Sequence, residues 1–174
     1  TTVGDLKGNA RLIEEAVARA QDQGVDLIAF PELTITGYPP EDLVLYDDFI
    51  AANKVALSQI SNTVGDIVAV VGFVDSENEK LFNSAAIIHR GKIVTTYRKI
   101  HLPNYGVFDE QRYFRQGKEC LILSIKGVKI GVNICEDIWQ QLGPSEVQRA
   151  AGAQVIVNLN ASPYESGKQE ERLE

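Results

Sequence analysis

The sequence predicts a layered α/β domain, a sandwich in which helices cover mixed parallel and antiparallel strands. Three observations lead to this class. Segments with apolar residues at helical spacing alternate with short, nearly continuous apolar runs of the kind seen in buried strands. Two pairs of these runs are separated by a two-residue turn that contains glycine, as in β-hairpins. The 174 residues, 44% of them hydrophobic, are enough to bury a substantial core.

The amino-terminal segment predicts a helix followed by a buried strand. Apolar residues recur at helical spacing between Asn9, the expected N-cap, and Gly24, a common C-terminal stop. These residues are Leu12, Ile13, Ala16, Val17 and Ala20. The run from Val25 to Phe30 is almost entirely apolar, as in a strand that is covered on both faces. Proline has no N–H to donate, so we expect this strand to end at Pro31.

A second helix and the middle strands follow a long loop. We expect the helix to open at Asp47 or Asp48, because acidic residues are favoured in the first helical turn. Its apolar positions are Phe49, Ala52, Val55, Ala56 and Ile60. Three strand-like runs come next, and the last two flank Arg90 and Gly91 as in a hairpin. The three runs span residues 67–74, 83–89 and 92–98.

The last third of the chain predicts an aromatic loop, a second hairpin, a short helix and a final strand. Residues 100–118 show no periodicity but are rich in aromatic side chains, so we expect a packed loop. The aromatic residues are Tyr105, Phe108, Tyr113 and Phe114. The second hairpin turns at Lys126 and Gly127. Its strands, the helix and the final strand span residues 120–125, 128–134, 145–151 and 154–160.

Composition and charge argue against several classes of function. No apolar run approaches the ~20 residues that a membrane span needs, and no signal leader is evident, so we expect no membrane partner. The net charge is -7 and the acidic residues are scattered, which argues against nucleic acid. Two cysteines, Cys120 and Cys135, fit a reducing compartment better than a disulfide framework. The expected location is the cytoplasm.

Reactive side chains fall directly after the predicted strands. VDLIAF is followed by Pro31 and Glu32, KIVTTYR by Lys99 and VKIGVNI by Cys135, and Ser162 lies just beyond VIVNLN. Ligand sites in open α/β sheets gather at the carboxyl ends of the strands. If these strands share one sheet edge, the groups that follow them converge.

These residue types support nucleophilic catalysis. A thiol is only weakly ionised at neutral pH, so Cys135 needs a base, and Glu32 can take its proton and later return it to a leaving amine. Lys99 can stabilise the resulting oxyanion, together with the backbone N–H of Glu136. Each such donor contributes about 3 kcal/mol of transition-state stabilisation.

Other interpretations stay open at this point. A lone cysteine at a strand end is usually a packing residue, which is how we interpret Cys120. His101 and Cys135 could instead form a Cys–His pair, although two histidines in the whole chain give this little support. Neither His89 nor His101 has a partner at metal-ligand spacing, so we expect no metal site.

Three blocks of the sequence resemble a known family. FPELTITGYPPEDL (30–43), YRKIHLPNYGVFDEQRYF (97–114) and NICEDIW (133–139) are similar to the signature blocks of the nitrilase, or carbon–nitrogen hydrolase, superfamily. More narrowly, GYPPEDL and CEDIW resemble the glutaminase domains of glutamine-dependent NAD synthetases. The resemblance implies an αββα sandwich of four layers with mixed sheets. It also implies hydrolysis of glutamine to glutamate and ammonia through a cysteinyl thioester.

The resemblance assigns the three catalytic roles as the chemistry does: Glu32 is the base, Lys99 the oxyanion stabiliser and Cys135 the nucleophile. It further implies a set of substrate-binding residues. Glu136 and Ser162 would recognise the amino-acid end of glutamine, and Lys168 is a weaker candidate for its carboxylate. The other implied pocket residues are Tyr38, Tyr105, Phe108 and Glu110.

The resemblance also implies that residues 1–174 are a partial glutaminase domain of a longer protein. The family's first strand would precede Thr1, and the domain would continue past Glu174, so we expect a sheet truncated at both ends. A synthetase domain of the same polypeptide would follow and would use ATP and Mg²⁺. This domain itself needs no cofactor, and we expect it to form a homo-oligomer.

Two alternatives to an NAD synthetase glutaminase remain. One is a stand-alone amidase or carbamoylase with the same chemistry. The other is a noncatalytic nitrilase-like scaffold, against which the presence of all three residues Glu32, Lys99 and Cys135 argues.

Overall fold

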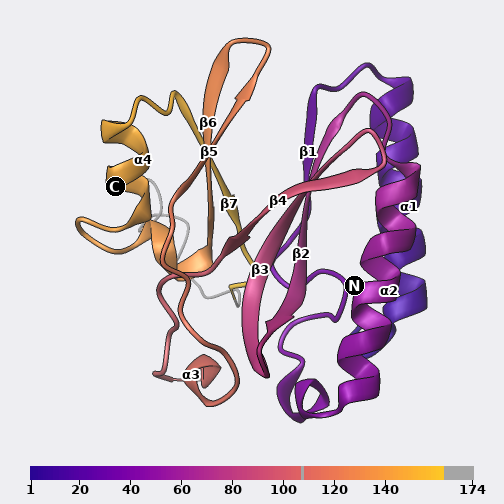
Figure 1. The fold of residues 1–174 in the computed structure, drawn as a ribbon, viewed down its shortest axis with the longest axis vertical. Coiled ribbons are helices and arrows are strands. Elements are labelled where there is room, and N and C mark those ends of the chain that lie inside the picture. Colours follow the sequence, from indigo (N-terminus) through magenta and orange to yellow (C-terminus); the bar gives the residue numbers. More distant parts are fainter. Residues whose placement is uncertain (107, 163–174) are drawn as a thin grey trace.

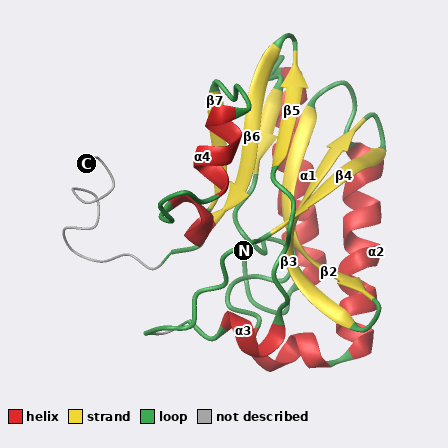
Figure 2. Cartoon of the chain, turned by 60° about the vertical axis from the view of Figure 1, so that its left-hand side comes forward, coloured by secondary structure: helices red, strands yellow, loops and turns green. Residues whose placement is uncertain are grey.

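The chain folds into layers of helices and sheets (Figure 1). The computed structural model describes residues 1–106 and 108–162. Helices α1 (Leu6–Asp22) and α2 (Asp47–Thr63) lie side by side against a four-stranded sheet. A three-stranded sheet packs on the other face of the first, and α4 (Pro144–Ala150) lies beside β6 on the outside (Figure 2). The predicted α/β class with mixed sheets is therefore confirmed.

The first sheet brings two of its strand ends to one edge. It contains β1 (Leu27–Ala29), β2 (Val68–Glu77), β3 (Lys80–His89) and β4 (Lys92–Arg98), in the order β1-β2-β3-β4. Strand β1 runs parallel to β2, whereas the pairs β2–β3 and β3–β4 are antiparallel. Strands β1 and β4 therefore run in the same direction, and the residues that follow them leave the sheet at the same edge.

The second sheet repeats this arrangement. It contains β5 (Leu121–Ile125), β6 (Val128–Ile134) and β7 (Val155–Leu159), in the order β5-β6-β7. Strand β6 is antiparallel to β5 and parallel to β7, so the chain after β6 and the chain after β7 leave at one edge. The strands that precede Glu32, Lys99, Cys135 and Ser162 were expected to share one sheet edge. They belong to two different sheets. Two sheets bring their edges together instead.

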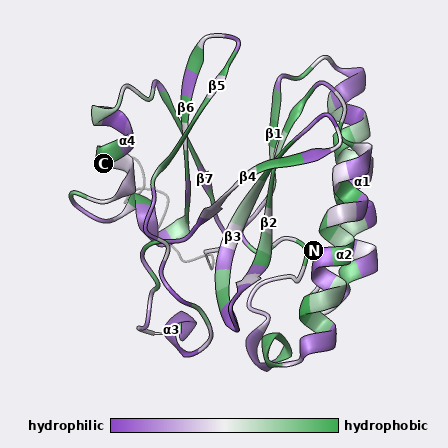
Figure 3. Ribbon diagram, in the orientation of Figure 1, coloured by the Kyte–Doolittle hydropathy of each residue, from purple (hydrophilic) through white to green (hydrophobic). Residues whose placement is uncertain are grey.

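Hydrophobic side chains fill both interfaces of the first sheet. Helices α1 and α2 are striped with hydrophobic and hydrophilic residues, which marks them as amphipathic (Figure 3). Their buried residues, such as Ile13 and Ile60, pack against Val71 of β2. The alternate residue Val70 faces the other way and packs with Val132 of β6. The two sheets are thus joined by side-chain packing.

The amino-terminal elements differ from the prediction in two ways. Helix α1 begins at Leu6, and its N-cap is Asp5, whose side chain accepts from the backbone N–H of Gly8 at 2.9 Å. Asn9 lies inside the helix and is buried, and its amide donates to the carbonyl of Ile35 at 3.0 Å. Strand β1 lies at the edge of the sheet and is only partly buried. Its two faces are nevertheless covered as expected, because Ile28 packs on the side of the helices and Leu27 on the side of the second sheet.

The middle of the chain holds a hairpin that the sequence pattern missed. Strands β2 and β3 are longer than expected and are joined by Asn78 and Glu79, both with positive φ. The loop at 100–118 contains a short helix, α3 (Glu110–Tyr113), and is packed only in part. Phe114 is buried, whereas Tyr105 is 59% exposed. From β4 onward the other predicted strands and α4 agree with the structure to within one residue at each end.

Two general features bear on the environment of the protein. None of the helices in the described part of the chain has the length and hydropathy that a membrane crossing requires. Both cysteines are free, as expected. Cys135 is buried, but Cys120 is exposed at the start of the second hairpin, so its interpretation as a packing residue was wrong. A thiol that is buried beside polar groups differs from one that merely fills the core, and the surroundings of Cys135 therefore decide between the two interpretations.

Candidate active site

Glu32 is placed by the chain that leaves β1 along β2. The backbone N–H of Phe30 donates to Val70 and that of Ile35 donates to Gly72, so this segment follows β2 closely. The Glu32 side chain is 1% exposed. Its Oε1 accepts from Lys99 Nζ and from Asn83 Nδ2, both at 2.7 Å. Its Oε2 is buried and has no hydrogen-bond partner among the described residues.

Lys99 lies directly after β4 and is fully buried between two carboxylates. Its Nζ donates to Oε1 of Glu32 at 2.7 Å and to Oε1 of Glu110 at 2.8 Å. Burial alone would lower the pKa of Lys99, but the two carboxylates outweigh it and raise the pKa above its ordinary value. The ammonium is therefore charged at neutral pH. The ammonium has three N–H groups, and because two of them donate to these carboxylates, one is left to donate to another acceptor.

Glu110, the first residue of α3, links Lys99 to Tyr38. Its Oε1 also accepts from the hydroxyl of Tyr38 at 3.1 Å. Burial raises the pKa of Glu110, and Glu32 adds to the shift, while Lys99 opposes it. The pKa of Tyr38 is raised by burial first and by the charge of Glu110 second, so the hydroxyl stays protonated. Tyr38 and Glu110, both implied pocket residues, thus belong to one cluster with Lys99.

Asn83 of β3 is a member of this cluster that the sequence analysis did not single out. It is completely buried, and its Nδ2 donates to Glu32 at 2.7 Å and to Glu110 at 3.2 Å. Its Oδ1 has no partner in the described part of the chain. An asparagine at the start of an apolar strand run was the available signal. Its importance depends on partners that are distant in sequence, which no local pattern reveals.

Cys135 stands at the junction of β6 and a 3₁₀ helix (Cys135–Ile138), as the strand-to-helix turn predicted. Its φ of 44° lies in the left-handed region, which costs a non-glycine residue roughly 1–3 kcal/mol. The Sγ lies 3.6 Å from Oδ1 of Asn160 and 3.5 Å from Oγ of Ser162. Burial, and then the charge of Glu32, raise the pKa of Cys135 to about 11, against the effect of Lys99. The thiol is therefore protonated at neutral pH.

The residues around the following turn form a second hydrogen-bonded group. The Tyr105 hydroxyl donates to Oε2 of Glu136, and Gln140 Nε2 donates to Oε1, both at 2.7 Å. The hydrogen bond to Glu136 raises the pKa of Tyr105 to about 12. The rings of Tyr105 and Phe108 meet edge to face, with centroids 5.7 Å apart. Tyr105 and Glu136 are thus adjacent, as a shared pocket requires.

The remaining candidates are placed as follows. Ser162 lies against the thiol of Cys135 and shares the side-chain oxygen of Asn160 with it. Lys168 lies outside the described residues. His101, the alternative partner of the thiol, donates its backbone N–H to Asp137. The side chains that act on the thiol of Cys135 as hydrogen-bonding groups include Asn160, Ser162 and Glu32.

Comparison with known proteins identifies the family. The family model described as carbon–nitrogen hydrolase matches residues 1–174. The chain belongs to this family. Glutamine-dependent NAD(+) synthetase from Thermotoga maritima is 46% identical to this carbon–nitrogen hydrolase over 170 residues, which cover 96% of the chain and 29% of the relative. The corresponding synthetase from Aquifex aeolicus is 43% identical over 96% of the chain and 30% of its own length.

Solved structures agree with this placement of the carbon–nitrogen hydrolase chain. Glutamine-dependent NAD+ synthetase from Acinetobacter baumannii, in complex with ADP, is 40% identical with a TM-score of 0.93, over 98% of this chain and 32% of that one. An amidase from Nesterenkonia sp. AN1 has the same fold, with a TM-score of 0.84 at 24% identity, over 98% of this chain and 65% of that one. The chain thus spans about a third of the length of its synthetase relatives. The resemblance inferred from the three sequence blocks is confirmed.

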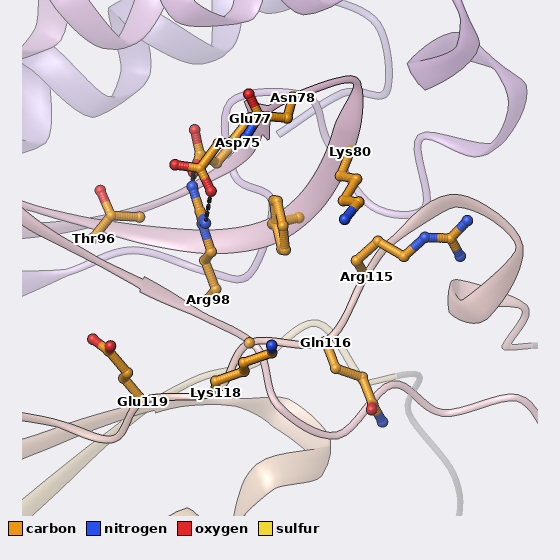
Figure 4. A pocket seen from close by; sticks show the side chains of 12 residues that line it. Asp75, Glu77, Asn78, Lys80, Thr96, Arg98, Arg115, Gln116, Lys118 and Glu119 are labelled. Carbon is orange, nitrogen blue, oxygen red and sulfur yellow. Dashed lines mark hydrogen bonds and ion pairs between the residues drawn. The ribbon is translucent and has the colours of Figure 1, made fainter.

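Two of the cavities between described residues of this carbon–nitrogen hydrolase differ in their relation to the site. One of about 310 Å³ is lined in part by Tyr38, Phe108 and Glu110, so it reaches the carboxylate cluster. A larger one, of about 760 Å³, contains none of the predicted site residues (Figure 4). There Arg98 is paired with Asp75 and Glu77. Among the described residues, no group of three or more side chains is arranged to bind a metal ion.

Proposed function

We propose that this carbon–nitrogen hydrolase releases ammonia from the side-chain amide of glutamine, as the glutaminase part of an NAD synthetase. One observation carries the proposal: Glu32 and Lys99 form a buried ion pair at 2.7 Å, and the thiol of Cys135 lies close enough for both groups to shift its pKa. The relatives that are more than 40% identical support glutamine as the substrate, because they are glutamine-dependent NAD(+) synthetases. Family membership supports hydrolysis of a carbon–nitrogen bond.

The first half-reaction forms a thioester. Glu32 Oε2, which has no other partner in the described chain, takes the proton of the Cys135 thiol as Sγ attacks the amide carbon. The remaining N–H of Lys99 and the backbone N–H of Glu136, in the first turn of the 3₁₀ helix, donate to the oxyanion. Glu32 then gives the proton to the amide nitrogen. The carbon–nitrogen bond breaks, and ammonia leaves.

The second half-reaction regenerates the enzyme. Glu32 takes a proton from a water molecule, whose oxygen attacks the thioester carbonyl. The same donors stabilise the second oxyanion. The carbon–sulfur bond breaks, glutamate is released, and the proton returns to the sulfur of Cys135. A raised thiol pKa suits this cycle, because the resting enzyme holds the proton that the leaving ammonia needs.

The other pocket residues would recognise the rest of glutamine. Glu136 offers a carboxylate to the substrate ammonium, and its hydrogen bonds from Tyr105 and Gln140 fix its orientation. Ser162 lies next to the sulfur and offers a hydroxyl. We further propose that Phe108, Tyr38 and Glu110 form the pocket wall, and that Lys168 contributes to binding the substrate carboxylate.

The proposal extends to the whole protein. A synthetase domain of the same polypeptide would consume the ammonia, using ATP and Mg²⁺ to convert nicotinic acid adenine dinucleotide to NAD. The glutaminase domain would itself need no cofactor. The chain's share of about a third of each synthetase relative supports this division. A cytoplasmic homo-oligomer is part of the same proposal.

The direct test is Cys135→Ala in the intact protein. We expect ammonia release from glutamine to be abolished, while NAD synthesis from added ammonium salts continues, because only the nucleophile is removed. Cys120→Ser is the matched control and should keep both activities, since Cys120 is an exposed thiol outside the site. Loss of both activities in Cys135→Ala would contradict the division of labour.

The same assay separates the alternatives. A stand-alone amidase would hydrolyse simple amides or carbamoyl compounds without supporting NAD formation from glutamine. A noncatalytic scaffold would release no ammonia from any amide, with or without Cys135.

A further inference from the structure

Asp137 is a buried carboxylate that the proposed reaction does not use. It lies two residues after Cys135 and has no exposed surface. Its Oδ1 accepts from the backbone N–H of His101 at 2.8 Å and of Ile100 at 3.2 Å. Its Oδ2 accepts from the hydroxyl of Tyr97 at 2.7 Å and from the backbone N–H of Ile134 at 3.1 Å. All four positions of the carboxylate are therefore filled by donors.

The donors come from both sides of the active site. Tyr97, Ile100 and His101 flank Lys99 in the chain, whereas Ile134 immediately precedes Cys135. Strands β4 and β6 belong to different sheets, so no ladder of backbone hydrogen bonds aligns them. Packing between apolar side chains fixes their separation only loosely, because hydrophobic contacts are not directional. Asp137 adds a directional link between the segment that carries Lys99 and the segment that carries Cys135.

We propose that Asp137 is a positioning residue. It fixes the turn that carries Cys135 relative to Lys99, and therefore relative to Glu32, which is paired with Lys99. This inference rests on the proposed glutaminase function. Asp137 acts through the backbone and through Tyr97 rather than by touching the substrate. The left-handed conformation of Cys135 increases the need for such support, because a strained turn persists only where its surroundings hold it.

The hydrogen-bonding pattern requires the ionised form of Asp137. Only a carboxylate offers acceptor sites to four donors at once, and a protonated acid or an amide would place a hydrogen against one of them. Burial raises the pKa of Asp137, and the donors Tyr97, His101 and Ile134 oppose that shift. Burial likewise raises the pKa of Tyr97, which keeps its hydroxyl a donor. The hydrogen bond between Tyr97 and Asp137 therefore joins a protonated phenol, as donor, to a carboxylate, as acceptor.

The test compares Asp137→Asn and Tyr97→Phe with the wild type in the intact protein. Asp137→Asn turns an amide N–H toward a backbone donor, so we expect kcat for ammonia release to fall roughly 10- to 100-fold, as for a misplaced reactive group. KM for glutamine should change less than about threefold, because Asp137 does not touch the substrate. Tyr97→Phe removes one donor of four and should give a smaller fall in kcat of the same kind.

A control separates positioning from general stability. Ile60→Ala makes a cavity between the helices and the first sheet, away from the site, and should lower the melting temperature without changing kcat of the folded protein. Wild-type kcat in both Asp137→Asn and Tyr97→Phe, or a fall in kcat that merely tracks the unfolded fraction, would overturn the inference. Should Asp137→Asn not fold, Tyr97→Phe decides by the same criterion. A wild type that releases no ammonia would instead overturn the proposed function, and this inference with it.

Discussion

At the scale of single residues, the site depends on how the ammonium of Lys99 is shared between two carboxylates. The ammonium of Lys99 is paired with two buried carboxylates, those of Glu32 and Glu110. Asn83 donates to both carboxylates and reduces the cost of keeping them ionised. Burial, and then the charge of Glu32, raise the pKa of the neighbouring Cys135 thiol to about 11. In the resting enzyme Cys135 is therefore a protonated thiol, which becomes nucleophilic when Glu32 takes its proton.

The thiol pKa gives a prediction for Glu32→Gln. We expect kcat for ammonia release to fall about 10²- to 10⁴-fold, because the general base is lost. The same change removes a charge that raises the pKa of Cys135, so that pKa should fall below about 11. Alkylation of Cys135 by iodoacetamide at pH 8.5 should then become faster than in the wild type, since more thiolate is present.

The alkylation is best followed from pH 7 to 11 in a Cys120→Ser background, which removes the exposed second thiol. In the wild type the rate should keep rising well above pH 9, and in Glu32→Gln the midpoint should lie lower. An unchanged midpoint would mean that Glu32 does not act on the sulfur.

The sequence predicted the residues at this scale where they follow strands. Glu32, Lys99 and Cys135 stand out because each is a reactive side chain within two residues of the end of a predicted strand. Asn83 and Asp137 do not, because their roles consist of hydrogen bonds to residues distant in the chain. The role of Glu110 came only from the family resemblance.

At the scale of elements, strand β2 sets the position of Glu32. The segment after β1 lies so close to β2 that a side chain at Gly72 would have no room. A methyl group there would collide with the carbonyl oxygen of Pro31 and lie 2.6 Å from the backbone nitrogen of Leu33. Both residues are neighbours of Glu32. Two backbone segments thus approach each other closely at Gly72. Such an approach is a common reason for a glycine inside a strand.

This contact predicts the effect of Gly72→Ala. The methyl group should push the Pro31–Leu33 segment away from β2, lowering kcat for ammonia release and destabilising the fold by roughly 1–3 kcal/mol. Ala69→Val is the matched control, because Ala69 is on the same strand and faces the helices. It should reduce stability with little change in kcat. Equal kcat values for the two variants would show that the close approach does not position Glu32.

Element boundaries were predicted best where glycine marks the turns. Arg90–Gly91 and Lys126–Gly127 gave both hairpins correctly, whereas the hairpin at Asn78 and Glu79 was missed because no glycine or proline signals it. The apolar run of β1 predicted cover on both faces, and Ile28 and Leu27 do pack on opposite sides of the sheet. An apolar run does not reveal whether a strand lies at the edge of its sheet, as β1 does.

At the scale of the whole molecule, packing of the two sheets brings the ends of four strands together at one site. Strands β1 and β4 deliver Glu32 and Lys99 from the first sheet, and β6 and β7 deliver Cys135 and Ser162 from the second. The core between the sheets includes Cys135 itself, together with Val70, Tyr97 and Leu159. The positions of these residues at predicted strand ends indicated that the ends converge. The sequence pattern could not predict that two sheets are needed, because strand pairing is determined by contacts between distant residues.

The central claim is that Cys135 is the nucleophile that attacks glutamine, and covalent trapping tests it most directly. The intact protein is incubated with a diazo-ketone analogue of glutamine, and the modified peptide is identified by mass spectrometry. We expect one adduct on Cys135, formed in step with the loss of ammonia release and slowed by added glutamine, with Cys120 unmodified. An active protein that carries no adduct on Cys135, or carries it on Cys120 alone, would contradict this claim.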